Sequence, residues 1–312
     1  MRPDLLHDAR PMHARVPLAA YACLAASMAL VGSYVGLSKL LVGAFPVFLL
    51  AGLRFAIAAA AMPHWLRRQA GEAPLSRGDR VLLFWESFLG NFLFSICMLS
   101  GIARSTALAA GVIMAALPAV VAVLSRVFLG ERIAPRVAAG IACAVAGIAL
   151  VSLAREGPGG TGTLLGNALL FGAVVCEASY VVIGKRLAAQ VSARRISALV
   201  NAWGLALVAP FALWQALGFD FHAVAAPMWV LLLFYSIAAS VVTVWLWMTG
   251  LRHVPASSAG VFTVLLPVAA AAVGVLFLGE RVMPAQGAAF ALALAGVLLA
   301  TWRRRSAASL PA

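Results

Sequence analysis

A long internal repeat is the strongest constraint on what this chain can fold into. The segment from Gly101 to Ile133, GIARSTALAAGVIMAALPAVVAVLSRVFLGERI, recurs from Gly250 to Val282 as GLRHVPASSAGVFTVLLPVAAAAVGVLFLGERV. The two copies lie 149 residues apart and are identical at 13 of 33 positions, including a Leu-Pro pair and a Phe-Leu-Gly-Glu-Arg run. Because this spacing is close to half of the 312 residues, the repeat predicts a chain built from two related halves.

The amino-acid composition places both halves in a lipid bilayer. Apolar residues make up 64% of the chain, charged residues make up 11%, and the mean hydropathy is +1.01. Soluble domains are about half apolar and about a quarter charged. Ten helical spans of about 20 residues would use about 200 residues and leave only short connections. We therefore predict an all-α integral membrane protein with ten transmembrane helices in two inverted five-helix repeats and no separate soluble domain.

Ten apolar segments separated by charged or Pro/Gly-rich breaks are the candidate helices. They are predicted near residues 16–38, 45–63, 81–100, 104–125, 135–154, 163–184, 196–216, 228–249, 257–277 and 283–302. The first is longer than the apolar core of a signal peptide, which is about 7–15 residues, so we expect it to remain as a span. The predicted domains are a tail at 1–15, a first repeat at 16–154, a second repeat at 163–302 and a basic tail at 303–312.

The positions of the basic residues predict how the spans are oriented. With a cytoplasmic N-terminus, 18 of the 23 lysines and arginines fall in cytoplasmic segments, four fall outside, and Arg54 falls within a span. This asymmetry follows the positive-inside rule and predicts two cytoplasmic termini, in a bacterial-type cytoplasmic (inner) membrane. Topology thereby explains the net charge of +13, since the basic residues are dispersed over short loops and do not form a nucleic-acid-binding face.

Five helices per half also predict that the second half runs through the membrane upside down relative to the first. The Gly-Glu-Arg turn would then be cytoplasmic at 130–132 and external at 279–281. A second match supports the division, because Ser33-Tyr34-Val35 with Lys39 recurs 146 residues later as Ser179-Tyr180-Val181 with Lys185. Both halves therefore begin and end alike.

This pattern resembles the EamA family of the drug/metabolite transporter superfamily. The resemblance covers the span-one motif ending at Lys39, the Leu53-Arg54-Phe55 motif in span two, and the blocks Pro118 to Glu131 and Pro267 to Glu280. It implies an inverted-repeat bundle whose central cavity is lined by helices one, three, four, six, eight and nine and opens alternately to either side. The chain differs from the usual pattern at Glu177, where the family commonly has an aromatic or apolar residue.

The repeated turns and prolines also have structural interpretations. Gly130 and Gly279 are expected to end helices in a left-handed conformation, and Glu131 and Glu280 lie where the N-terminus of the next helix favours negative charge. We expect the turns Gly130-Glu131-Arg132 and Gly279-Glu280-Arg281 to be structural hairpins, with a gating contact as the alternative. Pro118 and Pro267 lie within predicted spans, where they would kink the helix or form a hinge.

Three charged residues fall inside the predicted spans: Arg54, Glu86 and Glu177. Each costs about 2.5 kcal/mol or more at the bilayer centre unless it faces protein, a partner or water. The three share a similar depth and could meet, in which case desolvation would favour a proton on one carboxylate, as a proton-coupled carrier requires. The alternatives are a structural anchor for Arg54 and direct access to cytoplasmic water for Glu86.

Polar and aromatic residues in the spans supply further candidates for a solute cavity. Ser87, Asn91 and Ser95 form an i, i+4, i+8 stripe about 100° or more from Glu86 around the helix, so we expect them to serve a different surface. Helix packing is the alternative for such a stripe. The predicted cavity residues are Tyr34, Glu86, Asn91, Glu177, Tyr180 and Trp245, with Arg54 as the intramembrane charge partner.

The sequence shows no pattern that predicts enzymatic chemistry, a metal site or a cofactor. Its four cysteines, at 23, 97, 143 and 176, lie singly in apolar spans without the spacing of a metal site or a disulfide framework. It contains no HExxH motif, phosphate loop or dinucleotide fingerprint, and its four aspartates fall outside the predicted spans. We therefore do not expect an enzyme.

The resulting prediction is a secondary transporter that exports a small organic solute, such as an amino acid or a drug-like compound, by alternating access. Its expected partners are the solute, membrane lipid and protons, and no nucleic acid. The family resemblance and the excess of buried carboxylate favour export coupled to proton entry. An uncoupled facilitator and a noncatalytic membrane scaffold subunit are the alternatives.

Overall fold

The computed structural model describes residues 18–68, 72, 74–129, 133, 135–153, 163–187, 191–251, 262–263 and 265–301. Within these residues the chain is all-helical and contains no strand. In the first half of the sequence the helices are α1 (Leu18–Ala44), α2 (Val47–Ala61), α3 (Arg77–Ser87), α4 (Phe94–Ala103), α5 (Ala107–Met114), α6 (Leu117–Leu129) and α7 (Pro135–Leu153). In the second half they are α8 (Leu164–Leu187), α9 (Ala193–Leu217), α10 (Ala226–Ile237), α11 (Thr243–Leu251), α13 (Leu265–Phe277) and α14 (Pro284–Thr301).

Six of the described helical stretches are long and apolar enough to cross a membrane. They are Leu18–Ala44, Arg77–Ala103, Ala107–Phe128, Leu164–Gly184, Arg194–Leu217 and Ala226–Trp247. Shorter apolar helices in the described residues are Val47–Ala61, Pro135–Leu150, Leu265–Phe277 and Pro284–Leu299. The helical membrane fold is thus present, while the count of ten spans stays a prediction.

Helix α3 begins earlier than the apolar pattern predicted, because a capping box fixes its N-terminus. Ser76 Oγ accepts a hydrogen bond from the N–H of Asp79 at 3.1 Å, and the Asp79 carboxylate accepts one from the N–H of Ser76 at 2.9 Å. These side chains satisfy amide groups that a first helical turn leaves without a partner. The helix therefore starts at Arg77 and not near residue 81.

Two of the long helical stretches contain a π-helical segment. Segment η2 (Phe88–Leu93) joins α3 to α4, and η5 (Ala238–Val242) joins α10 to α11. Residues 238–242 correspond to residues 89–93 at the repeat spacing of 149, so the two segments occupy matching places in the two halves. Such segments add a residue to one helical turn and are frequent at functional sites.

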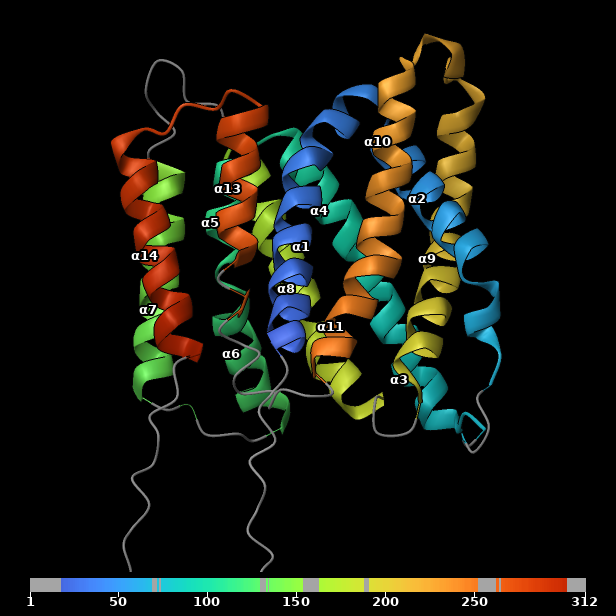
Figure 1. Cartoon of the computed structure of the whole chain (residues 1–312), viewed down its shortest axis with the longest axis horizontal. Coiled ribbons are helices and arrows are strands. Elements are labelled where there is room, and N and C mark those ends of the chain that lie inside the picture. Colours follow the sequence, from blue (N-terminus) through green and yellow to red (C-terminus); the bar gives the residue numbers. More distant parts are fainter. Residues whose placement is uncertain are drawn as a thin grey trace, which may run out of the picture.

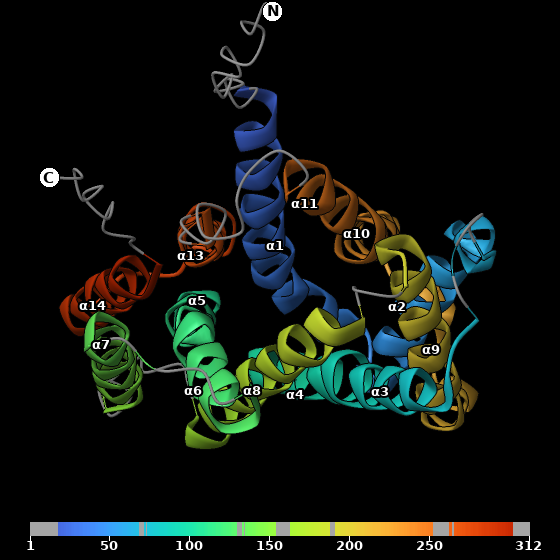
Figure 2. The same cartoon turned by 90° about the horizontal axis from the view of Figure 1, so that it is seen from below.

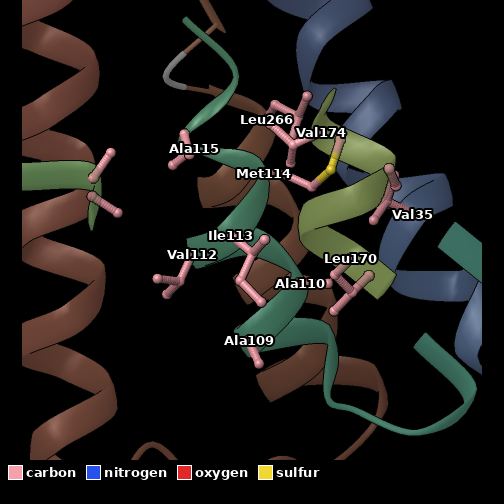
Figure 3. Packing of buried hydrophobic residues seen from close by; sticks show 14 of the residues in the cluster. Val35, Ala109, Ala110, Val112, Ile113, Met114, Ala115, Leu170, Val174 and Leu266 are labelled. Carbon is pink, nitrogen blue, oxygen red and sulfur yellow. The ribbon is translucent and has the colours of Figure 1, made fainter. Parts of the chain in front are cut away.

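Helices from the two halves of the sequence pack against each other along the whole molecule. Helix α7 packs on α14, α2 on α9 and α5 on α13, while α1 lies against α13 and α11. Figure 1 and Figure 2 show the α7–α14 pair at one end of the molecule and α2 with α9 toward the other end. The largest apolar cluster lies where α5 contacts α8, α1 and α13, and it buries Met114, Ile113 and Val174 together with Val35 and Leu266 (Figure 3).

Two glycines bring α1 close to α13. A Cβ added at Gly32 would lie 2.8 Å from the Cβ of Ala269 and 2.9 Å from the amide nitrogen of Ala270, and one added at Gly36 would lie 2.8 Å from the Cβ of Val273. Small residues let helix backbones approach closely in a membrane, where apolar side chains gain little by leaving lipid. The contact between α1 and α13 therefore depends on the missing side chains.

Replacement of Gly32 by valine is expected to destabilise the folded protein by about 1–3 kcal/mol, because the added side chain overpacks the α1–α13 contact. Thermal unfolding of the detergent-solubilised protein, followed by tryptophan fluorescence, measures the change. Gly43→Val is the matched control on the same helix, because no heavy atom lies within 4 Å of a Cβ at that position. Equal unfolding temperatures for the two variants would contradict the packing argument.

Candidate functional site

Arg54 of α2 carries a buried positive charge, and only 6% of the residue is exposed. Its Nη2 donates hydrogen bonds to Asn91 Oδ1 at 3.0 Å and to Ser95 Oγ at 2.9 Å. The guanidinium carbon lies 4.3 Å from the ring centre of Phe55 and 5.9 Å from that of Tyr235, distances at which aromatic rings attract a cation. These neutral groups orient the guanidinium without neutralising its charge.

The π segment η2 places Asn91 between two other helices. While its Oδ1 accepts from Arg54 of α2, its Nδ2 donates to the carbonyl oxygen of Val200 of α9 at 2.8 Å. Ser95 Oγ donates to the carbonyl oxygen of Asn91 at 2.5 Å. Ser87 Oγ instead donates to Leu83 within its own helix at 2.6 Å. The structure therefore assigns two members of the predicted stripe to Arg54 and leaves Ser87 as a helix-backbone contact.

Glu177 of α8 carries the opposite charge near Arg54. Its carboxylate interacts electrostatically with Arg54, Tyr34 and Tyr180. No ion pair of 4.0 Å or less joins it to Arg54 in the described part of the chain. The ring of Tyr34 packs edge-on against that of Tyr235, with ring centres 5.6 Å apart. A cation and an anion thus lie apart beside tyrosine rings, an arrangement that can receive one molecule bearing both charges.

The meeting of three charges stays a prediction for Glu86 of α3, which makes no hydrogen bond or ion pair with Arg54 or Glu177 among the described residues. Glu86 is 0% exposed, which contradicts the prediction of direct access to water. Neither carboxylate oxygen has a hydrogen-bond partner among the described residues. It lies close to α8 at Gly184, where an added Cβ would lie 2.8 Å from Oε1. Glu86 interacts electrostatically with Tyr180, which also interacts with Glu177.

A second polar contact joins α9 to η5 at the place that corresponds to Arg54 and Asn91. Ser240 Oγ donates to Asn201 Oδ1 at 3.1 Å, and Asn201 Nδ2 donates to the carbonyl oxygen of Ser197 at 2.8 Å. Both Asn201 and Ser240 are buried. Neither this pair nor Tyr235 was predicted from the sequence, although alignment of the repeats places Ser240 opposite Asn91 at the spacing of 149.

Lys39 and Glu280 hold the turn between α4 and α5 from opposite sides. Lys39 Nζ donates to the carbonyl oxygens of Ile102, Ala103 and Ser105 at 2.8, 3.2 and 2.6 Å, which caps the C-terminus of α4. The two carboxylate oxygens of Glu280 accept from the N–H groups of Ala107 at 2.7 Å and Leu108 at 2.9 Å. Each charge is placed at the helix end that it stabilises.

Glu280 therefore caps a helix N-terminus, as predicted, but the helix that it caps is not the predicted one. Its carboxylate caps the N-terminus of α5 and not that of the helix that follows it in sequence. Gly279 has a φ of 66°, which confirms the left-handed conformation predicted for it, and Arg281 is exposed. Gly130, Glu131 and Arg132 lie outside the described residues.

The predicted kink at Pro118 is a break in the helix. Helix α5 ends at Met114, residues 115–116 form a turn, and α6 begins at Leu117, so Pro118 lies in a first helical turn. Pro267 lies in the first turn of α13, which begins at Leu265. Proline fits a first turn because the amide donor it lacks would have no helical partner there. The two prolines thus occupy matching positions because each lies in the first turn of a helix.

The remaining candidate residues lie away from the group formed by Arg54, Glu177 and the tyrosine rings or have no assigned role in it. Trp245 of α11 is 50% exposed, and among the described residues no ring contact joins it to Tyr34, Tyr180 or Tyr235. The thiols of Cys97 and Cys176 interact across α4 and α8, a proximity that their sequence separation did not indicate. The described residues contain no cluster of three or more His, Cys, Asp or Glu side chains able to hold a metal ion.

Comparison with known proteins finds both similar sequences and a similar fold. The model of the EamA-like transporter family matches residues 18–153 and, separately, residues 164–302. The uncharacterized transporter YetK of Bacillus subtilis (strain 168) is 34% identical over 298 residues, which are 95% of this chain and 90% of that protein. A crystal structure of a protein with 22% sequence identity has a TM-score of 0.60 and covers 91% of this chain and 96% of that chain, which is a likeness of fold.

Proposed function

Because the chain belongs to the EamA-like transporter family and is a multi-pass membrane transporter, we propose that it is a secondary carrier that exports a small organic solute by alternating access. The solute class that the site favours is the amino acid or another small zwitterion. Drug-like compounds with the same pair of charges belong to this class.

The observation that carries this proposal is the pair of opposite charges on α2 and α8. Arg54 is fixed by Asn91 and Ser95, which leave its charge unneutralised and available to a carboxylate. Glu177 is available to an ammonium group, which the nearby tyrosine rings also attract. A zwitterion placed between them would satisfy two charges that the protein leaves apart.

Several features support two inverted five-helix units, at 16–154 and 163–302, that rock about this site. The family model matches the two halves separately. Corresponding helices of the two halves pack on each other, as α2 does on α9, α5 on α13 and α7 on α14. The π segments also occupy matching places. Ten spans arranged in this way are the construction from which many carriers obtain alternating access.

Orientation, membrane and coupling are parts of the same proposal. The excess of lysine and arginine in alternate loops supports cytoplasmic termini in a bacterial inner membrane. The buried carboxyl group of Glu86, the partly buried one of Glu177 and the single buried guanidinium of Arg54 support proton entry as the driving force, because one carboxyl group is left without a counter-charge.

Transport of amino acids into vesicles containing the purified chain, with and without a pH gradient, tests the proposal. Flux of at least one amino acid is expected to respond to the gradient, and Glu177→Gln is expected to weaken transport, because the amide removes the anionic partner of an ammonium group. Ser179→Ala is the matched control two residues away, since the Ser179 hydroxyl bonds only to the Val175 carbonyl of its own helix.

Two outcomes would redirect the proposal. Flux that ignores both the gradient and the Glu177→Gln substitution would identify an uncoupled facilitator. Absence of flux for every solute in a broad panel, with correctly folded protein, would favour a noncatalytic scaffold subunit.

A further inference from the structure

Glu86 is the buried ionisable group that the solute site leaves unexplained. Its side chain is fully buried on α3, the helix that also contributes Leu83 to an apolar cluster with Leu187 of α8 and Val200 of α9. Both carboxylate oxygens lack a hydrogen-bond partner among the described residues. An ionised carboxylate in such surroundings is strongly disfavoured unless it is paired or hydrated.

The neighbouring charged side chains that the structure describes do not supply a partner. On α9, Arg195 pairs with Glu72 at 3.3 Å, and Arg194 lies over the ring of Trp65. On α3 itself, Arg80 donates to the carbonyl oxygen of Leu75. The titratable side chain that faces Glu86 from α8 is Tyr180, while the side chains of Lys185 and Arg186 lie outside the described part of the chain.

The space occupied by the carboxyl group exists because residue 184 is glycine. A Cβ at that position would lie 2.8 Å from Glu86 Oε1, closer than side-chain carbons approach other atoms in proteins. The carboxyl group therefore rests against the bare backbone of α8. Separation of α3 from α8 would uncover this place.

Tyr180 connects this place to the solute site. It interacts electrostatically with both Glu86 and Glu177, and its ring packs against Gly90 of η2. The segment η2 also carries Asn91, which holds Arg54. A movement of α3 and η2 relative to α8 therefore changes the surroundings of Glu86 and of the solute charges together.

The geometry points to Glu86 as a dedicated proton-binding site of the carrier, distinct from the solute site, that is protonated while α3 packs on α8 and ionises when these helices part. This inference rests on the proposed transport function and names the residue that would couple it to protons. Because the packed arrangement excludes the ionised form, acid favours this arrangement and alkali favours the separated one. Export of the solute and entry of the proton would then use the same movement in opposite directions.

Infrared difference spectroscopy of the full chain in vesicles, stepped between acid and alkaline buffer without any solute, tests the inference. The wild type is expected to lose a protonated-carboxyl band as the pH rises, and Glu86→Gln is expected to lack that band. Glu177→Gln is the matched control and should retain it. Glu86→Asp keeps a carboxyl group at the site and should shift the band, which assigns it even if the amide variant folds poorly.

If both Glu86 variants kept the protonated-carboxyl band at its wild-type position, the inference would be overturned. The measurement needs no solute, so a band assigned to Glu86 together with an absence of flux would uphold the proton site and reject the transport proposal. Flux that keeps its full response to a pH gradient in Glu86→Gln would show that another group couples the proton.

Discussion

Replacement of Arg54 by leucine is expected to reduce amino-acid flux by about a hundredfold. Loss of one partner from a buried charge pair costs about 2–5 kcal/mol, and a loss of about 3 kcal/mol corresponds to about a hundredfold in affinity. In this protein the loss falls on the solute, because the partners of Arg54 among the described residues are neutral oxygens and aromatic rings. Initial rates of flux in vesicles measure the effect for each amino acid that the wild type carries.

Two further variants separate a solute-binding role from a structural anchor. Arg54→Lys keeps the charge but cannot reproduce the planar fork that reaches Asn91 and Ser95, so an intermediate loss is expected. Arg80→Leu removes an exposed arginine from α3 and should leave flux unchanged. Wild-type flux in a correctly folded Arg54→Leu protein would place the solute elsewhere.

Replacement of Glu280 by alanine is expected to lower the free energy of unfolding by about 2–4 kcal/mol. The change removes two hydrogen bonds to an ionised acceptor and leaves the N–H groups of Ala107 and Leu108 without that partner. The cost is high because the contact joins segments 172 and 173 residues apart in sequence, so local rearrangement cannot restore it. Thermal unfolding followed by tryptophan fluorescence measures the change.

The neighbouring Arg281 supplies the control for this experiment. Its side chain is exposed, so Arg281→Ala should change the unfolding temperature little. The combination of Glu280→Ala with Lys39→Met should cost less than the sum of the two single changes, because both residues hold the same turn. Full additivity would mean that the two ends of the turn are held independently.

The fold was predictable as far as it depends on hydropathy and on the repeat. The apolar segments located the helices, and their lengths identified a membrane protein. The start of α3 was missed because it depends on the Ser76–Asp79 capping box, a polar signal outside the apolar segment. The π segments were invisible because an added residue in a turn leaves an apolar sequence looking the same, whereas the break at 115–116 lies just before the predicted kink at Pro118.

The candidate site was predictable only in its charged members. Arg54 and Glu177 stood out because charges are rare in spans, and the structure brings them into electrostatic contact. For Glu86 it shows no hydrogen bond or ion pair with either residue among those described, since depth along a helix says nothing about which neighbour a side chain faces. Tyr235 was missed because an aromatic residue in an apolar span carries no signal of its own. Glu280 was assigned to the wrong helix because its partners lie far away in sequence.

Two hydrogen-bonded pairs occupy matching positions in the two halves but differ in charge. One pair is Arg54 with Asn91, which carries a positive charge, and the other is Asn201 with Ser240, which is neutral. A dipolar molecule held between α2 and α8 would therefore lie with its negative end toward Arg54 at every stage of the cycle. It would cross the bilayer in one fixed orientation. The carrier would select solutes more strictly by the distance between their two charged groups than by the size of their side chains. Homologues that exchange the arginine for a neutral residue would be expected to accept cargo of another kind on the same framework.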